Sequence, residues 1–106
     1  MASEERLKIL EDSLVQDPDD VLTRYLLGME YRALEKVEQA ISHFNSVLER
    51  NPDYVPAHFM LAQCFEEEEE FEQAREAYEL GITTATRTGD LKSAGEMQQA
   101  LDMLDD

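Results

Sequence analysis

The chain has 106 residues, of which 25 are Asp or Glu and 9 are Lys or Arg, so its formal net charge is −16. Its length and its 42% content of hydrophobic residues fit one small globular domain and exclude a wholly disordered chain. The negative charge argues against nucleic-acid binding, because contacts to the phosphate backbone need clustered Lys and Arg.

The chain begins with an acidic, polar segment, MASEERLKIL, which lacks the features of a secretory signal. No apolar run approaches the ~18 residues that a membrane-spanning helix needs. The single cysteine, Cys64, excludes an intramolecular disulfide. We therefore expect a cytoplasmic protein that does not contact a membrane.

Helix-forming residues dominate the sequence and no long stretch alternates apolar with polar residues, so the predicted fold class is all-α. Residues typical of helix ends occur at Asp17–Asp20, Asn51–Asp53 and Thr88–Asp90, and shorter turns are expected at Glu35–Lys36 and Glu69–Glu70. Six helices are predicted in chain order: about Ser3–Gln16, Asp20–Leu34, Val37–Arg50, Asp53–Glu68, Phe71 to about Thr84, and Asp90 to about Leu104.

An internal repeat organises these helices. Residues 18–51 align with residues 52–85 at an offset of 34, with eight identical positions. A period of this length that contains two predicted helices is typical of a helix-turn-helix repeat. The identical pairs are Pro18/Pro52, Asp19/Asp53, Val21/Val55, Leu27/Leu61, Glu35/Glu69, Glu38/Glu72, Gln39/Gln73 and Ala40/Ala74.

The shared pattern resembles that of the tetratricopeptide repeat (TPR) family. That family has a small residue directly after a Leu in the first helix and an aromatic residue three positions later. An Ala opens its second helix, an aromatic residue follows four positions later, and a Pro ends the unit. The matching residues are Leu27-Gly28, Tyr31, Ala40, Phe44 and Pro52 in one repeat, and Leu61-Ala62, Phe65, Ala74 and Tyr78 in the next.

The resemblance implies a single domain, residues 1–106, folded as a short right-handed solenoid of helical hairpins. Its parts are an N-terminal half repeat (1–17), two full repeats (18–51 and 52–85) and a C-terminal capping helix (90–106).

The sequence departs from the family pattern at three positions. Arg24 and His58 replace an aromatic residue near the start of the first helix, and we interpret His58 as a packing residue. Thr86 replaces the closing proline of the second repeat, which predicts an irregular turn before the last helix.

The resemblance also implies that partners bind on a concave face, which the first helix of each repeat lines. The residues that map to this face are Leu22, Tyr25, Met29 and Arg32 in one repeat, and Pro56, Phe59, Gln63, Glu66 and Glu67 in the next. The family's clamp for a terminal carboxylate needs Asn and Lys or Arg, and the corresponding positions here are Tyr25, Met29 and Met60. We therefore expect no binding of a peptide C-terminus through such a clamp.

The run of acidic residues Glu66–Glu70 has two interpretations. It forms an acidic lip that attracts Lys or Arg on a partner, or it is a solvated turn that keeps the solenoid soluble. The overall acidity could also reflect adaptation to high salt. The sequence leaves these alternatives open.

No motif points to catalysis, a cofactor or a metal. His43 and His58 lie on different predicted helices, without Cys or acidic residues at metal-ligand spacing. The sequence neighbours of Cys64 include Glu rather than a positive charge, which favours a structural thiol over a reactive one. No glycine-rich phosphate loop or nucleophile motif occurs.

We therefore predict a non-enzymatic protein–protein interaction module whose partner is a peptide or helix with apolar and basic residues. The first alternative is a self-associating homodimer, formed through the end helices with Met97, Met103 and Leu104 available on the last helix. The second is that the chain is a fragment of a larger scaffold protein.

Overall fold

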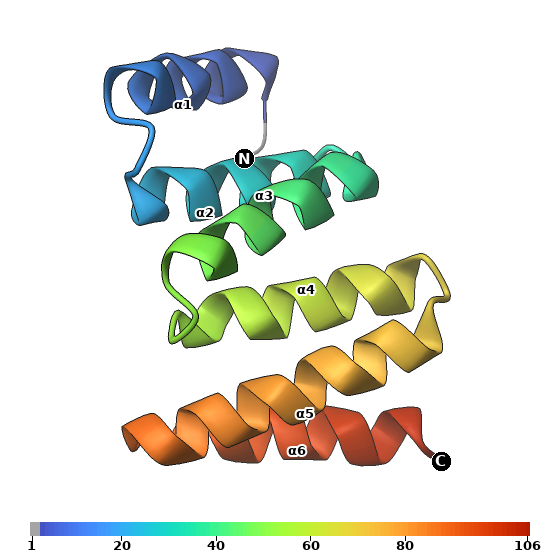
Figure 1. Cartoon of the computed structure of the whole chain (residues 1–106). Helices are drawn as coiled ribbons and strands as arrows, with labels where there is room; N and C mark the ends of the chain where they lie inside the picture. The colour runs from blue at the N-terminus through green and yellow to red at the C-terminus, as the bar shows by residue number, and fades with distance from the viewer. Residues whose placement is uncertain (1–2) are drawn as a thin grey trace.

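The computed structural model describes residues 3–106, and the regular elements in that range are six α-helices (Figure 1). Their order matches the sequence-based prediction of an all-α fold. The helices are α1 (Glu4–Gln16), α2 (Val21–Ala33), α3 (Val37–Arg50), α4 (Val55–Glu67), α5 (Phe71–Thr88) and α6 (Leu91–Leu104).

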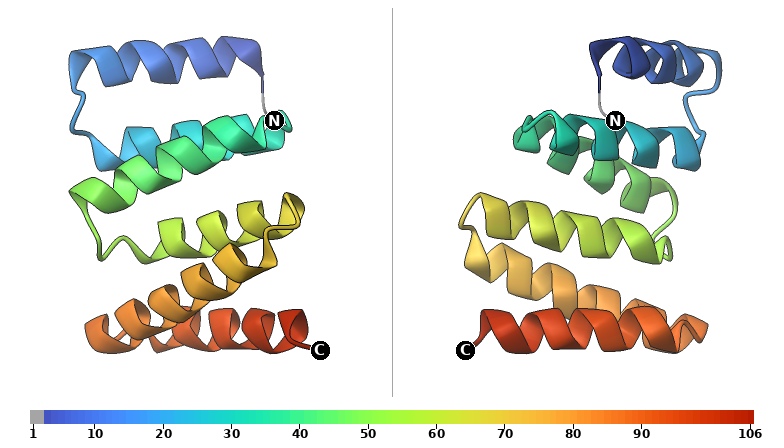
Figure 2. Two further views of the ribbon diagram at one scale, coloured as in Figure 1. Left: turned by 45° about the vertical axis from the view of Figure 1, so that its right-hand side comes forward. Right: turned by 180° about the vertical axis from the view of Figure 1, so that it is seen from behind.

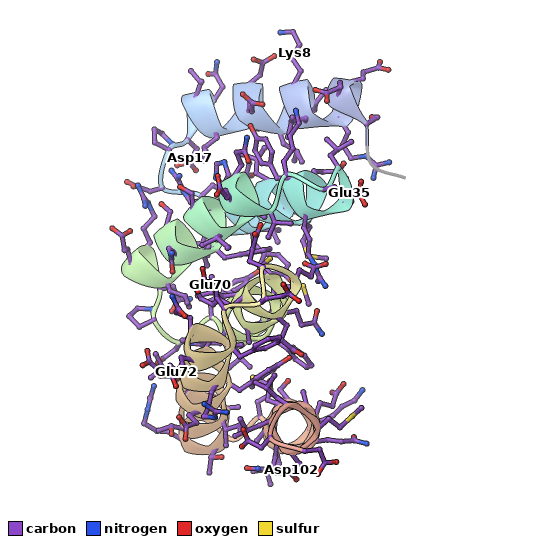
Figure 3. The ribbon with its side chains drawn as sticks, turned by 90° about the vertical axis from the view of Figure 1, so that its right-hand side faces the viewer. Lys8, Asp17, Glu35, Glu70, Glu72 and Asp102 are labelled. Carbon is purple, nitrogen blue, oxygen red and sulfur yellow. The ribbon has the colours of Figure 1, made fainter. Side chains whose placement is uncertain are left out.

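The helices form an elongated stack of 40 × 28 × 21 Å, in which each helix packs against its neighbours in the chain. Helices α2, α4 and α6 lie on one side of the stack, and α3 and α5 lie on the other (Figure 2). In Figure 3, α6 is seen end-on whereas α1 and α2 lie across the view, so the helix direction rotates along the stack. This arrangement is a solenoid of helical hairpins. None of the described helices is both long and apolar enough to cross a membrane.

Polar side chains fix the start of three helices. The carboxylate of Asp20 accepts hydrogen bonds from the backbone N–H groups of Leu22 and Thr23 and from the Thr23 hydroxyl at 2.7 Å. Chiefly because of the Thr23 hydroxyl, the pKa of Asp20 lies below its ordinary value. Ser3 and Asp90 cap α1 and α6 in the same way. These caps satisfy amide groups that have no partner within the helix.

Three turns between helices share one backbone geometry. Glu35, Glu69 and Gly89 have φ values of +63°, +59° and +84°. In each turn, this residue and the next one donate backbone hydrogen bonds back into the last turn of the preceding helix, which is the pattern of a Schellman motif. The predicted turns at Glu35–Lys36 and Glu69–Glu70 are therefore present. Figure 3 labels Glu35 and Glu70, which mark two of these turns.

The end of α5 differs from the prediction. The helix was expected to end at about Thr84 and to be followed by an irregular turn, but it continues to Thr88 and ends regularly at Gly89. A proline at position 86 would have removed a backbone donor and stopped the helix. Thr86 imposes no such constraint, so α5 gains another turn and ends at Gly89, which has a φ of +84°.

Buried side chains form two clusters along the stack. One surrounds Phe44 and Leu61, between α3 and α4, and the other surrounds Tyr78 and Met97, where α4, α5 and α6 meet. The half-buried Phe65 packs against both clusters, so the core is continuous. Helix α2 approaches α3 closely because position 28 is Gly: a Cβ atom there would lie only 2.6 Å from Cε1 of Phe44.

Helix α6 exposes less apolar surface than the sequence predicted. Met97 was expected to be available for self-association, but its side chain is fully buried. A Cβ atom at Gly81 would lie 2.6 Å from Sδ of Met97, so Met97 occupies the space that this glycine leaves on α5. Leu104 is half-buried against the core, and Met103 is exposed.

Candidate functional site: the face formed by α2 and α4

The first helices of the two repeats, α2 and α4, carry all the residues predicted to bind a partner; we call this surface the α2–α4 face. On α2 the fractional exposures of Leu22, Leu26 and Met29 are 54%, 40% and 38%. These residues have the i, i+4, i+7 spacing of one helix face, so they form an apolar stripe exposed to solvent. Leu26 was not among the predicted residues, although its spacing from Leu22 was the available signal.

Tyr25 and Phe59, the two aromatic residues among those predicted to line this face, are half-buried. The ring centroid of Tyr25 lies 5.7 Å from that of Phe44 and 5.3 Å from that of Tyr54, and the centroid of Phe59 lies 6.0 Å from that of Tyr78. Burial raises the pKa of Tyr25 above its ordinary value. Both rings therefore pack against the core beneath the α2–α4 face, and part of each ring remains exposed to solvent.

Arg32 joins the two helices of this face. Its Nε donates to Oε1 of Glu67 at 2.9 Å, and its Nη1 donates to Oε1 of Gln63 at 2.8 Å and to Sδ of Met60 at 3.3 Å. Three of the predicted site residues, Arg32, Gln63 and Glu67, thus form one polar network between α2 and α4. Because the planar guanidinium of Arg32 is bound by two acceptors on α4, it fixes the spacing of α2 and α4.

Glu66 and Glu67 have different hydrogen-bond partners. Oε2 of Glu66 accepts a hydrogen bond from the hydroxyl of Tyr78, which is buried on α5. Burial, followed by this hydrogen bond, raises the pKa of Tyr78 above its ordinary value. The carboxylates of Glu66 and Glu67 therefore already have partners in the fold. Glu68, Glu69 and Glu70, which follow them in the acidic run, are exposed.

Arg24 and His58, which replace the family's aromatic residue, fold back on the loop before their own helix. Nη2 of Arg24 donates to the carbonyl of Pro18 at 2.8 Å, and Nε2 of His58 lies 2.9 Å from the carbonyl of Pro52. The two contacts are related by the 34-residue repeat. His58 is buried, in keeping with its interpretation as a packing residue.

Cys64 lies in the core with no exposed surface, and burial raises the pKa of its thiol to about 11. The thiolate form that reacts with electrophiles is therefore scarce at neutral pH. Among residues 3–106, no group of three or more His, Cys, Asp and Glu side chains is arranged to hold a metal ion.

Residues 25–90 match the family model described as tetratricopeptide repeat. The chain belongs to the tetratricopeptide repeat family. A TPR repeat-containing protein of Pseudomonas aeruginosa is 31% identical over 96 residues, which cover 91% of each chain.

Two solved structures show the same stacking of helices. A solution structure of a Bordetella parapertussis protein is 30% identical and has a TM-score of 0.84, covering 98% of this chain and 89% of that one. The TPR2B domain of yeast Sti1, in a complex with pHsp70, is 20% identical and has a TM-score of 0.87, covering 93% of this chain and 79% of that one. TPR domains generally mediate contacts between proteins, and this chain has their fold.

Proposed function

We propose that this chain is a non-enzymatic TPR module that binds a segment of a partner protein on the α2–α4 face. The observation that carries the proposal is the apolar stripe of Leu22, Leu26 and Met29, exposed directly beside the Arg32–Gln63–Glu67 network. An apolar stripe beside ordered polar groups suits a peptide or amphipathic helix that buries two or three apolar side chains.

The charges of the face indicate the chemistry of the partner. Arg32 is held by Glu67 and Gln63, so it is poorly placed to receive a carboxylate. Oε2 of Glu67 and the exposed carboxylates that follow it favour Lys or Arg on the partner. We therefore propose a partner segment with apolar anchors and basic flanking residues. The pHsp70 complex of the Sti1 domain supports a protein partner in general terms.

The experiment is selection of a phage-displayed random peptide library on the immobilised chain, followed by affinity measurement with the synthesised peptides. The test variant is Leu22→Ser/Met29→Ser, which removes exposed side chains and leaves Tyr25 and Phe59 in the core. We expect this variant to bind about tenfold or more weakly, which corresponds to one or two lost apolar contacts.

The matched control is Ile9→Ser/Val15→Ser, which removes two exposed aliphatic side chains from α1. We expect its affinity to equal that of the unchanged chain. Equal affinities for both double variants would overturn the proposed site, and so would failure of the library to yield any binding peptide.

A second candidate is a homodimer through α6, where Leu91 and Met103 are 69% and 71% exposed. These two side chains, rather than Met97, would form the interface. Sedimentation at several concentrations tests it: a dimer that Met103→Ser dissociates supports this candidate, and a monomer at high micromolar concentration contradicts it.

A further inference from the structure

A groove lies between α3 and α5, on the side of the stack opposite the α2–α4 face. It has a volume of about 650 Å³, which is in the range of sites that hold a ligand or a large side chain. Its floor is apolar and includes Leu48, Leu61 and Ala77, and His58 lies at its base. We call this hollow the α3–α5 groove.

The groove is a feature of the repeat. A smaller hollow of about 380 Å³ lies one repeat earlier, and seven of its residues are related to residues of the α3–α5 groove by the 34-residue offset. The seven pairs are Glu11/Asn45, Leu14/Leu48, Val15/Glu49, Pro18/Pro52, Arg24/His58, Leu27/Leu61 and His43/Ala77.

Arg24 and His58 line the two hollows at corresponding positions of the repeat. Each side chain lies within hydrogen-bond distance of the carbonyl of a proline in the preceding loop.

The rim of the α3–α5 groove combines apolar and acidic side chains. Leu80 projects from α5 and is 57% exposed. Glu49 lies on the opposite wall, and Glu76 lies one helical turn before Leu80 on the exposed face of α5. Within residues 3–106, neither Glu49 nor Glu76 forms an ion pair. Asp53 and Arg87 pair with each other and close one end of the groove.

We propose that the α3–α5 groove is a second docking site, for a basic segment of a protein partner. A large aliphatic or aromatic side chain of the partner enters the apolar floor beside Leu80, and Lys or Arg side chains flanking it meet Glu49 and Glu76. A second copy of this chain is a poorer occupant, because each copy carries a net charge of −16 and the two repel each other.

The test uses the full ¹⁵N-labelled chain and a synthetic amphipathic peptide with Leu and Lys at helical spacing. Amide chemical shifts are recorded during titration at about 0.15 M salt, the physiological ionic strength. We expect shifts at Asn45–Glu49 and at Ala77–Thr84. We expect Leu80→Ser to weaken this binding roughly fivefold to tenfold, the effect of about one lost aliphatic contact.

Leu22→Ser is the control, because Leu22 is as exposed as Leu80 but lies on the α2–α4 face. It should leave the shifts in the groove unchanged. The same peptide with Glu in place of Lys should not bind. Amide shifts confined to the α2–α4 face would contradict the second docking site and leave the proposed function unaffected. Groove shifts that occur on concentrating the chain without peptide would show a second copy as the occupant and also overturn it.

Discussion

At the scale of single residues, the hydrogen bond between Tyr78 and Glu66 joins a buried side chain of the core to the acidic run. We expect Tyr78→Phe to lower the free energy of unfolding by about 1–2 kcal/mol, because a partly desolvated carboxylate loses its donor. Denaturant titration measures this. Tyr54→Phe is the control, since Tyr54 packs through its ring against Tyr25. If Tyr78→Phe and Tyr54→Phe lower the free energy of unfolding equally, the hydrogen bond to Glu66 adds no stability of its own.

His43 gives stability a specific dependence on pH. Its ring stacks on Tyr31 with centroids 5.2 Å apart, and burial, followed by the charge of Arg24, lowers its pKa below the ordinary value of 6.5. Glu11 acts in the opposite direction but more weakly. The unfolded chain therefore binds more protons than the folded chain below about pH 6.5, and stability is lost as the pH falls through this range.

We expect the unchanged chain to lose stability relative to His43→Gln between pH 7.5 and pH 5. Comparison of the two proteins cancels the effect of the many carboxylates, which titrate mostly at lower pH. Denaturant unfolding of both at each pH measures the difference. A difference that does not change with pH would mean that His43 has the same pKa in the folded and unfolded chains.

At the scale of helices, the three Schellman turns differ in the residue that has positive φ. Glu35 and Glu69 occupy a backbone region that costs an ordinary residue about 1 kcal/mol, whereas Gly89 occupies it freely. We expect Glu35→Gly and Glu69→Gly each to raise the free energy of unfolding by about 1 kcal/mol. The two sites lie in different repeats, so the effects should add.

Gly89→Ala is the matched control, because it places a Cβ atom on the third turn of the same geometry. We expect it to destabilise the chain by about 1 kcal/mol. Thermal unfolding of these three variants and of the double variant Glu35→Gly/Glu69→Gly measures all these changes. If Glu35→Gly and Glu69→Gly instead lower the free energy of unfolding, the glutamate side chains make contacts that stabilise the fold by more than the backbone strain costs.

Much of this architecture could be predicted from the sequence because it depends on local signals. Helical spacing, the caps at Asp20 and Asp90 and the 34-residue repeat identified the six helices and their hairpin pairing. The last turn of α5 was missed because the absence of a proline at position 86 was interpreted as irregularity, although it permits continuation of the helix.

Features that depend on two helices together could not be predicted in this way. The burial of Met97 requires Gly81 on α5, and no spacing within α6 indicates it. The Arg32–Glu67 pair joins residues of different repeats, and the sequence alone gave no reason to choose it among 25 acidic residues. The α3–α5 groove is lined by residues of three helices, so no spacing within one helix indicates it.

At the scale of the whole molecule, charge repulsion opposes folding. Acidic side chains outnumber basic ones by 25 to 9, and the elongated stack brings them together along its surface. Raising the ionic strength from 0.01 M to 0.15 M shortens the Debye length from about 30 Å to about 8 Å. We expect the midpoint temperature of thermal unfolding to rise as the ionic strength is raised from 0.01 M to 0.15 M. A midpoint that falls would mean that the ion pairs, such as Arg32–Glu67, outweigh the repulsion.

We propose above that this TPR chain binds its partner on the α2–α4 face. The most direct measurement is amide chemical-shift mapping of the ¹⁵N-labelled chain with the tightest peptide selected from the library. If the partner binds on this face, the largest shifts occur in α2 from Leu22 to Arg32 and in α4 from Pro56 to Glu67. Largest shifts in α3 and α5, with those two segments unchanged, would contradict it.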